Sequence, residues 1–217
     1  VSTAYKNAAS QPFKDIGADL VVQRSEDQQA LPDKGPKSMR GIRLPFSNQV
    51  FRMKDLAALK RLEGIDATAH TLLLWEFSKN GFRTIMGVDA RQPALGALKA
   101  RDWVQKGRFP EKPGEIALEK HFAKFRKTQL GDVFQISGPP FTVVGTIGIK
   151  EGAQVTAANI YMSLDDAQNL LGKNPDAVNL IYLRLKNPSM VNRVKSELST
   201  EIKGASISSS DLFLDLM

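Results

Sequence analysis

Cysteine is absent from this sequence of 217 residues. Its absence excludes disulfide bonds, thiolate nucleophiles and cysteine-bound metals, but it leaves the cellular compartment open. Histidine is scarce: His70 and His121 are far apart, and neither has the i, i+4 partner of a helical metal site or a place in a Ser/His/Asp pattern. We expect both histidines to be surface or strand-filling residues.

Glycine-rich phosphate-binding motifs are missing as well. Gly145, Gly148 and Gly152 do not open a helix in a G-x-G-x-x-G or P-loop context, and they are typical of strand bends and turns. Asp165 and Asp166 are not expected to work as a catalytic pair, because adjacent residues of a helix do not face each other. Helix capping explains them better. We therefore expect no enzyme activity, no cofactor and no metal in this chain.

Long hydrophobic runs are missing too. The densest apolar cluster, residues 71–75, falls far short of the roughly 18 residues that a membrane helix needs, and there is no signal-peptide pattern. Because the first residue is Val1 and not methionine, we expect the chain to be processed or cut from a longer protein. Its length and its hydrophobic content of 42% are those of a globular protein with one or two domains.

Positive charge is what the chain does carry: 30 Lys and Arg against 23 Asp and Glu give a net charge of +7. The excess is spread over the first two thirds of the chain, which is compatible with acidic partners such as lipid headgroups or nucleic acid. The best basic and aromatic cluster, Lys120–Lys127, invites a nucleic-acid interpretation. We favour the alternative, a short helix that buries Phe122 and Phe125 and leaves its cations in solvent.

The middle of the chain has the clearest pattern. It predicts a strand over Glu115–Leu118 and a short helix over Glu119–Lys127, with Gly131 as the C-cap of that helix. Val133–Ser137 and Phe141–Gly145 then alternate in the manner of half-buried strands, and the glycine and two prolines between them indicate a hairpin turn.

Further strands and helices are predicted on both sides of this stretch. Met53–Leu62 is the clearest helix, because its apolar residues recur at three-residue steps. Asn80-Gly81 is the strongest hairpin signal, and Ser163 is expected to cap the helix that follows it. The other predicted strands are Ile16–Gln23, Gly41–Leu44, Ala67–Phe77, Phe82–Val88, Asn159–Met162, Ala177–Leu185 and Ala205–Ser208, and the last predicted helix is Pro188–Ile202.

Five short motifs occur in an order and spacing that match a known family. They are Gly87-Val88-Asp89, Lys106-Gly107-Arg108-Phe109-Pro110, Gly114-Glu115-Ile116-Ala117-Leu118, Leu130-Gly131-Asp132 and Phe141-Thr142-Val143-Val144-Gly145. Together with the strand at Ile16–Val22, they resemble the extracytoplasmic domain of MacB-type ABC transporter permeases. That superfamily includes the LolC/LolE lipoprotein-releasing permeases and FtsX-like proteins. The resemblance spans nearly the whole chain.

The resemblance implies an α+β fold in two parts. A porter-like subdomain rich in βαβ units would consist of residues 14–88 and 176–208, and a smaller β-rich, sabre-like subdomain would be inserted at 89–175. Residues 1–13 and 209–217 would be a membrane-proximal leader and tail. The two ends of the chain would then emerge next to each other at the membrane.

The resemblance also implies partners. Such domains are held on the periplasmic side of the plasma (inner) membrane between two transmembrane helices, and the permeases pair with a second copy or homologue and with a cytoplasmic ATP-binding subunit. The domain would couple ATP hydrolysis to movement outside the membrane and would contact a periplasmic partner or substrate, without catalysis of its own. In this preferred interpretation nucleic acid is no partner. The alternative is a basic soluble nucleic-acid-binding domain.

The basic loop between Arg24 and Asn48 matches no motif. Its length and charge suggest that residues 31–46 contact a partner or the membrane surface. We expect deletion of these residues to abolish partner binding with little change in melting temperature. Trp103 is added as a candidate because tryptophans in loops often serve interfaces. The residues predicted to bind a partner are Lys34, Lys37, Arg40, Arg43, Phe46 and Trp103.

Overall fold

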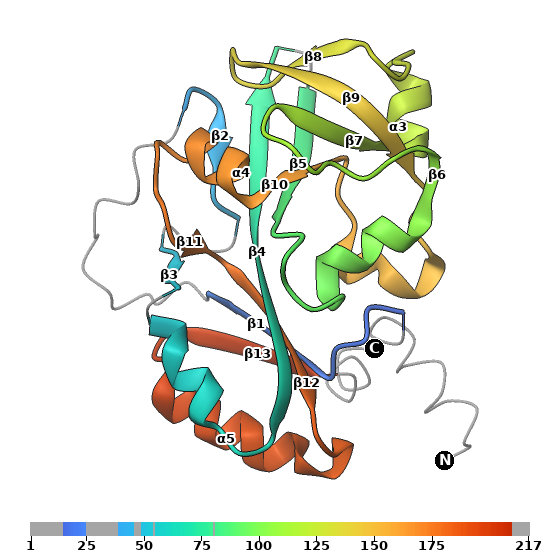
Figure 1. Ribbon diagram of the computed structural model, residues 1–217. Helices are drawn as coiled ribbons and strands as arrows, with labels where there is room; N and C mark the ends of the chain where they lie inside the picture. The colour runs from blue at the N-terminus through green and yellow to red at the C-terminus, as the bar shows by residue number, and fades with distance from the viewer. Residues whose placement is uncertain (1–14, 25–38, 46–48, 54, 80, 210–217) are drawn as a thin grey trace.

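The computed structural model describes residues 15–24, 39–45, 49–53, 55–79 and 81–209. Most of their strands form one 11-stranded mixed sheet, in the order β13-β1-β12-β4-β5-β10-β7-β9-β6, with β2 added to β4 and β8 added to β9 (Figure 1). β11 and β3 form a separate pair. A mixed sheet with helices is an α+β fold, as predicted.

The elements have the following bounds. The strands are β1 Leu20–Arg24, β2 Ile42–Arg43, β3 Phe51–Arg52, β4 Ile65–Ser78, β5 Gly81–Val88, β6 Val104–Gly107, β7 Glu115–Glu119, β8 Val133–Gln135, β9 Pro140–Ile147, β10 Ile160–Ser163, β11 Ala177–Val178, β12 Leu180–Leu185 and β13 Ala205–Ser209. The α-helices are α3 Lys120–Phe125, α4 Leu164–Leu170 and α5 Val191–Glu201, and the 3-10 helices are η1 Asp55–Arg61, η2 Gly96–Trp103, η3 Glu151–Thr156 and η4 Pro188–Met190.

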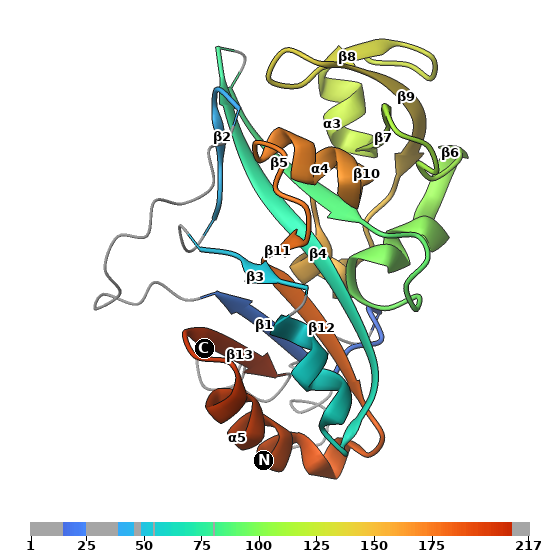
Figure 2. The same cartoon turned by 60° about the vertical axis from the view of Figure 1, so that its left-hand side comes forward.

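The 14-residue strand β4 runs through both halves of the molecule (Figures 1 and 2). It pairs with β12 as far as Thr71 and with β5 from Leu72 onwards, antiparallel in both cases. At this changeover lies the buried side chain of Asn179. Its Nδ2 donates to the carbonyl of Leu73, and its Oδ1 accepts from the Leu73 N–H, both at 2.7 Å. A side-chain amide therefore takes the place of a strand residue beside β4.

Side chains of the sheet alternate between two hydrophobic clusters, one on each face. On β7, Ile116 and Leu118 enter one cluster while Ala117 enters the other, as the two-residue period of a strand requires. α5 covers the first cluster in the half that contains β1, β12 and β13, where its Val194 and Leu198 are fully buried one turn apart. In the other half, α4 packs against β4 and β5, and α3 packs against β7 and β9.

The first and last described strands are neighbours. β1 pairs with β13 in an antiparallel register that places Leu20 opposite Ser209, so the two ends of the described chain lie side by side. The division at residues 88/89 and 175/176 stays a prediction. β5, which was assigned to the porter-like part, pairs in parallel with β10 of the expected insertion, so the sheet continues across that boundary. No helix among the described residues is both long and apolar enough to span a bilayer.

Several predicted elements are confirmed. β4 and β5 form the hairpin, with Ser78 opposite Gly81. β8 and β9 form the second hairpin, and Gly138 between them has a φ of 113°. Ser163 caps α4 by accepting from the N–H of Asp166 at 3.1 Å. The predicted strand Gly41–Leu44 contains β2.

Three local predictions are wrong in part. The helix at Met53–Leu62 is the 3-10 helix η1, because apolar residues three apart, such as Leu56 and Leu59, share a face when there are three residues per turn. Gly131 does not cap α3, which ends at Phe125 with Arg126 as its C-cap. The strand predicted at Ala177–Leu185 is two strands, since Asn179 separates β11 from β12.

Candidate partner-binding surface

The two histidines lie on different elements, His70 on β4 and His121 on α3. No group of three or more His, Asp or Glu residues that could hold a metal occurs in the described part of the chain. His70 fills a half-buried position on β4, where desolvation lowers its pKa, and its backbone N–H donates to Oε1 of Gln92 at 2.7 Å. His121 is exposed on α3.

The outer end of the β4–β5 hairpin carries three aromatic rings on one face. Trp75 and Phe77 are two residues apart on β4, and Phe82 lies opposite Phe77 on β5. The ring centroids of Trp75 and Phe82 are 5.6 Å apart, and those of Phe77 and Phe82 are 5.2 Å apart. Phe77 and Phe82 are 52% and 50% exposed. Large rings that stay half exposed at a hairpin end are typical of contact surfaces.

The opposite face of the hairpin holds a buried ion pair, Glu76–Arg83. Desolvation lowers the pKa of Arg83 while the Glu76 charge opposes this effect, and the Arg83 guanidinium lies 4.9 Å from the ring centroid of Phe134. Oε1 of Glu76 accepts from the backbone N–H of Ser137 at 2.8 Å, and the Ser137 hydroxyl donates to the carbonyl of Arg40 at 3.0 Å. One buried carboxylate thus joins the β8–β9 turn to the β4–β5 hairpin.

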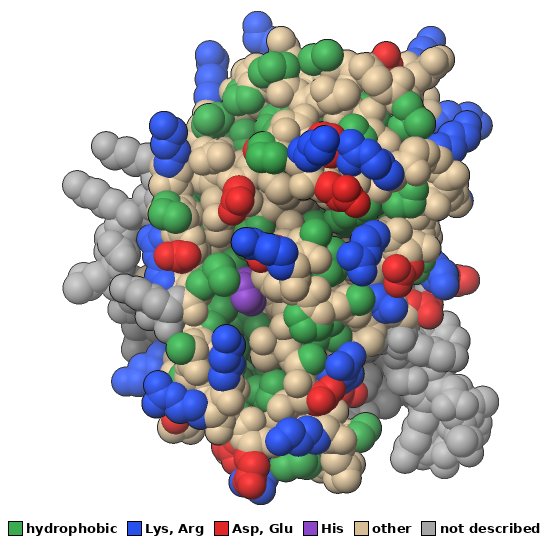
Figure 3. Space-filling model, in the orientation of Figure 1, with side chains coloured by type: hydrophobic (Ala, Val, Ile, Leu, Met, Phe, Trp, Pro, Cys, Tyr) green, Lys and Arg blue, Asp and Glu red, His purple; other side chains and the backbone are tan. Residues whose placement is uncertain are grey.

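A cavity of about 660 Å³ lies where these elements meet, and its lining includes Arg40, Phe77, Lys79 and Gln135. We call the exposed residues around it, Arg40, Arg43, Phe77, Lys79 and Phe82, the distal surface. It is at the far end of β4 from the paired ends of β1 and β13 (Figure 1). Basic and apolar side chains lie close together at this end in the space-filling view (Figure 3). Exposed rings beside cations suit a partner with acidic and apolar groups.

The predicted partner-binding residues fall into three groups. Arg40 and Arg43 are exposed on the distal surface, and Arg43 lies opposite Trp75 in the β2–β4 pair. Lys34, Lys37 and Phe46 lie outside the described residues. The loop position predicted for Trp103 is wrong: it ends η2, is 7% exposed and belongs to the second hydrophobic cluster. Sequence reasoning missed Phe77 and Phe82, although an aromatic residue on each side of the Asn80-Gly81 turn was a usable signal.

The basic and aromatic run Lys120–Lys127 is a short helix, as favoured. Phe122 contacts the ring of Phe134 with centroids 6.1 Å apart, but the predicted burial of Phe125 is wrong, because that ring is 80% exposed. The helix has six residues and buries only Ala123, so most of its surface is in contact with solvent.

Comparisons with known proteins bear on the identity of the chain. The family model for the MacB-like periplasmic core domain matches residues 1–201. The fold is similar to the periplasmic region of MacB from Actinobacillus actinomycetemcomitans, with a TM-score of 0.59, 12% identity and coverage of 94% of both chains. It is also similar to the extracellular domain of the noncanonic ABC-type transporter YknZ from Gram-positive bacteria, with a TM-score of 0.54, 15% identity and coverage of 88% of this chain and 99% of that one.

No curated protein sequence matches the chain significantly. At such low identities the two structures support the fold, whereas the family model covers most of the sequence itself. Both agree with the resemblance inferred from the five motifs. The chain therefore belongs to the MacB-like periplasmic core domain family, the extracytoplasmic domains of ABC transporter permeases.

Proposed function

We propose that this domain is anchored between two membrane helices of a permease and transmits movement to the distal surface when a cytoplasmic subunit hydrolyses ATP. The observation that carries the proposal is the pairing of β1 with β13, which brings both ends of the described chain to one place. A chain that leaves a bilayer and returns to it after a short distance must have this arrangement. Family membership favours this function over the nucleic-acid alternative.

The sheet offers a physical path for the movement. β4 has 14 residues, and at about 3.3 Å per residue it is about 46 Å long. Its first half is hydrogen-bonded to β12, which is the neighbour of β1, and its second half carries Phe77 at the distal surface. A tilt of the paired ends would therefore displace the distal surface through a continuous set of backbone hydrogen bonds.

Site-specific labels can test this coupling, because the 217 residues contain no native cysteine and any cysteine elsewhere in the permease or its ATPase subunit can be replaced. Lys79→Cys places a spin label on the distal surface, and Lys186→Cys places one just after β12; both lysines are exposed. The full-length permease is studied with its ATPase subunit in nanodiscs, and the measured quantity is the distance between the equivalent labels on the two permease copies. When ATP is added, we expect this distance to change more for the labels at position 79 than for those at position 186. Unchanged distances at position 79 in ATP and ADP would contradict the proposal.

The role of the distal surface needs a separate test. Phe77→Ser/Phe82→Ser is expected to reduce transport at least about tenfold, since aromatic anchors dominate the energy of most interfaces, while ATPase activity and melting temperature stay near wild type. Phe125→Ser is the matched control, because it removes an exposed ring on another element. Equal transport in both variants would argue against a partner at this surface. Deletion of residues 31–46 is unsuitable, because it removes β2 and the fully buried Ile42.

A further inference from the structure

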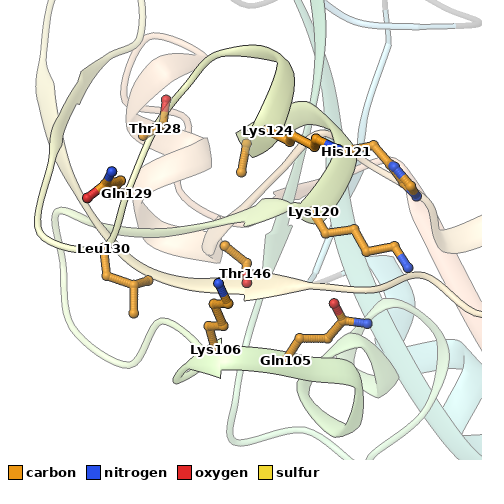
Figure 4. A pocket seen from close by; sticks show the side chains of 10 residues that line it. Gln105, Lys106, Lys120, His121, Lys124, Thr128, Gln129, Leu130 and Thr146 are labelled. Atoms are coloured by element: carbon orange, nitrogen blue, oxygen red, sulfur yellow. The ribbon is translucent and has the colours of Figure 1, made fainter.

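A second cavity, which we call the basic cavity, lies between α3 and β6 (Figure 4). Its volume is about 880 Å³, and its lining contains three lysines, Lys106, Lys120 and Lys124, beside neutral amides and hydroxyls such as those of Gln105 and Thr146. Neither Asp nor Glu lines it among the described residues. The lysines therefore give the cavity a positive charge, and the rest of the lining, which includes His121 and Leu130, is partly polar and partly apolar.

An irregularity of β6 directs two adjacent side chains to this cavity. Neighbouring residues of a regular strand point to opposite faces, yet Gln105 and Lys106 both line the cavity. The register between β6 and β9 shifts between Val104 and Lys106, and bulges of this kind redirect side chains. The Gln105 side chain lies over Gly148, where a Cβ atom would meet its Nε2 at 2.2 Å. The local backbone thus fixes both side chains towards the same space.

The other lysines come from the facing helix. Lys120 and Lys124 are four residues apart on α3, and Ala123 between them is buried, so both lysines share the face that borders the cavity. Figure 4 shows Lys120 of α3 and Lys106 of β6 around the same space, with Thr146 of β9 between the two elements. Like charges at this helical spacing repel each other. An anion in the cavity would relieve that repulsion.

Among the residues that the structure describes, the three lysines have no counterion, since none of them takes part in an ion pair there. The neighbouring Arg108 differs, because its Nη1 donates to Oε2 of Glu115 at 2.7 Å. The fold therefore neutralises the arginine after β6 but leaves the lysines that face the cavity able to meet an external anion.

We propose that the basic cavity binds a ligand that carries two or more phosphate groups. Lysine binds phosphate as a point charge, and three lysines that line one cavity without Asp or Glu among the described residues supply enough positive charge for a multiply charged anion. Two or more groups are needed because the lysines stand on two elements, Lys106 on β6 and the others on α3, across a cavity much larger than one phosphate. A soluble polyphosphate ester and a cluster of phospholipid headgroups share this chemistry.

The test uses the 217-residue protein and a pair of charge-matched variants. Lys106→Gln/Lys120→Gln/Lys124→Gln empties the cavity of lysine, and Lys60→Gln/Lys112→Gln/Lys186→Gln removes three exposed lysines elsewhere. Binding of sodium tripolyphosphate is measured by titration calorimetry. Co-sedimentation is measured with phosphatidylglycerol vesicles and with phosphatidylcholine vesicles as the neutral comparison. Melting temperatures establish that both variants fold, since all six positions are exposed.

We expect the cavity variant to bind tripolyphosphate at least about tenfold more weakly than wild type and the control variant to lose less than about threefold. If the selective loss occurs with tripolyphosphate alone, the ligand is soluble; if it occurs with phosphatidylglycerol vesicles, the ligand is a lipid headgroup. Equal losses in the two variants, or no binding of either probe by wild type, would overturn the proposal. Such a failure would leave the proposed transport function untouched, because that proposal rests on the pairing of β1 with β13 and on the distal surface, and neither variant changes a residue of these.

Discussion

Replacing Glu76 with glutamine should destabilise the protein far more than the loss of an ordinary ion pair. Glu76 and Arg83 have side chains only 2% and 6% exposed, so the substitution leaves the arginine charge buried without its counterion. The glutamine amide keeps an acceptor for the N–H of Ser137, so the charge is the main change. Breaking a buried pair from one side costs about 3–5 kcal/mol, which corresponds to a fall in melting temperature of roughly 6–20 °C for a domain of this size.

Two further variants make the result interpretable, with urea denaturation followed by circular dichroism. Glu76→Met/Arg83→Met removes both charges, and its expected cost of about 1–3 kcal/mol comes from the unpaired N–H of Ser137. Asp66→Asn breaks the exposed Arg184–Asp66 pair, whose side chains are 47% and 46% exposed, and should cost less than about 1 kcal/mol. The reasoning is refuted if Glu76→Gln costs no more than Asp66→Asn, or if the double variant is the least stable of the three.

Two other predictions concern backbone space and pH. Gly96→Ala should cost about 2–5 kcal/mol in urea denaturation, because φ is +62° and the new Cβ would lie 2.2 Å from the ring of Tyr182. Gly114→Ala, at φ +79° with nothing within 4 Å, should cost only about 1–2 kcal/mol; equal costs would contradict the steric argument. The hydrogen bond from Arg108 lowers the pKa of Glu115 to about 2. A carboxyl group whose pKa is lower in the folded state stabilises the fold at pH values above its unfolded pKa of 4.5, and this stabilisation is lost as the pH falls towards 2. Arg108→Met should therefore be less stable than wild type at pH 7, and the difference in stability should shrink by pH 2. If the stability difference between Arg108→Met and wild type does not depend on pH, the ionised Glu115 carboxylate is not its cause.

Local patterns predicted those elements whose structure depends on neighbouring residues. The alternation at β8 and β9, the hairpin signal before β5 and the Ser163 cap each depend on neighbouring residues, and the structure has the β8–β9 pair, the β4–β5 hairpin and the cap. The burial of Trp103 and the exposure of Phe125 were not predictable in this way. Both depend on where a short helix lies relative to a sheet that is assembled from distant segments.

The sites depended still more on long-range assembly. The basic run on α3 was visible in the sequence, but the cavity exists only because β6 lies across from it at the edge of the sheet. The distal surface likewise joins Arg40 to the β4–β5 hairpin through Ser137 and Glu76. No periodicity in the sequence indicates that the turn after β8 reaches that hairpin. β10 lies between β5 and β7 and pairs with β5 in parallel and with β7 in antiparallel orientation. The alternation of apolar and polar residues along a strand does not specify these neighbours or their directions.

The amide of Asn179 has a consequence for how the molecule unfolds. It pairs both backbone groups of Leu73 where β4 exchanges one neighbour for another, so these two groups are not open to water at the junction of the two halves. In native-state hydrogen exchange, amide protons on either side of residue 73 should then exchange with solvent through a single cooperative opening. Force applied at the paired ends of β1 and β13 should therefore unfold the two halves together.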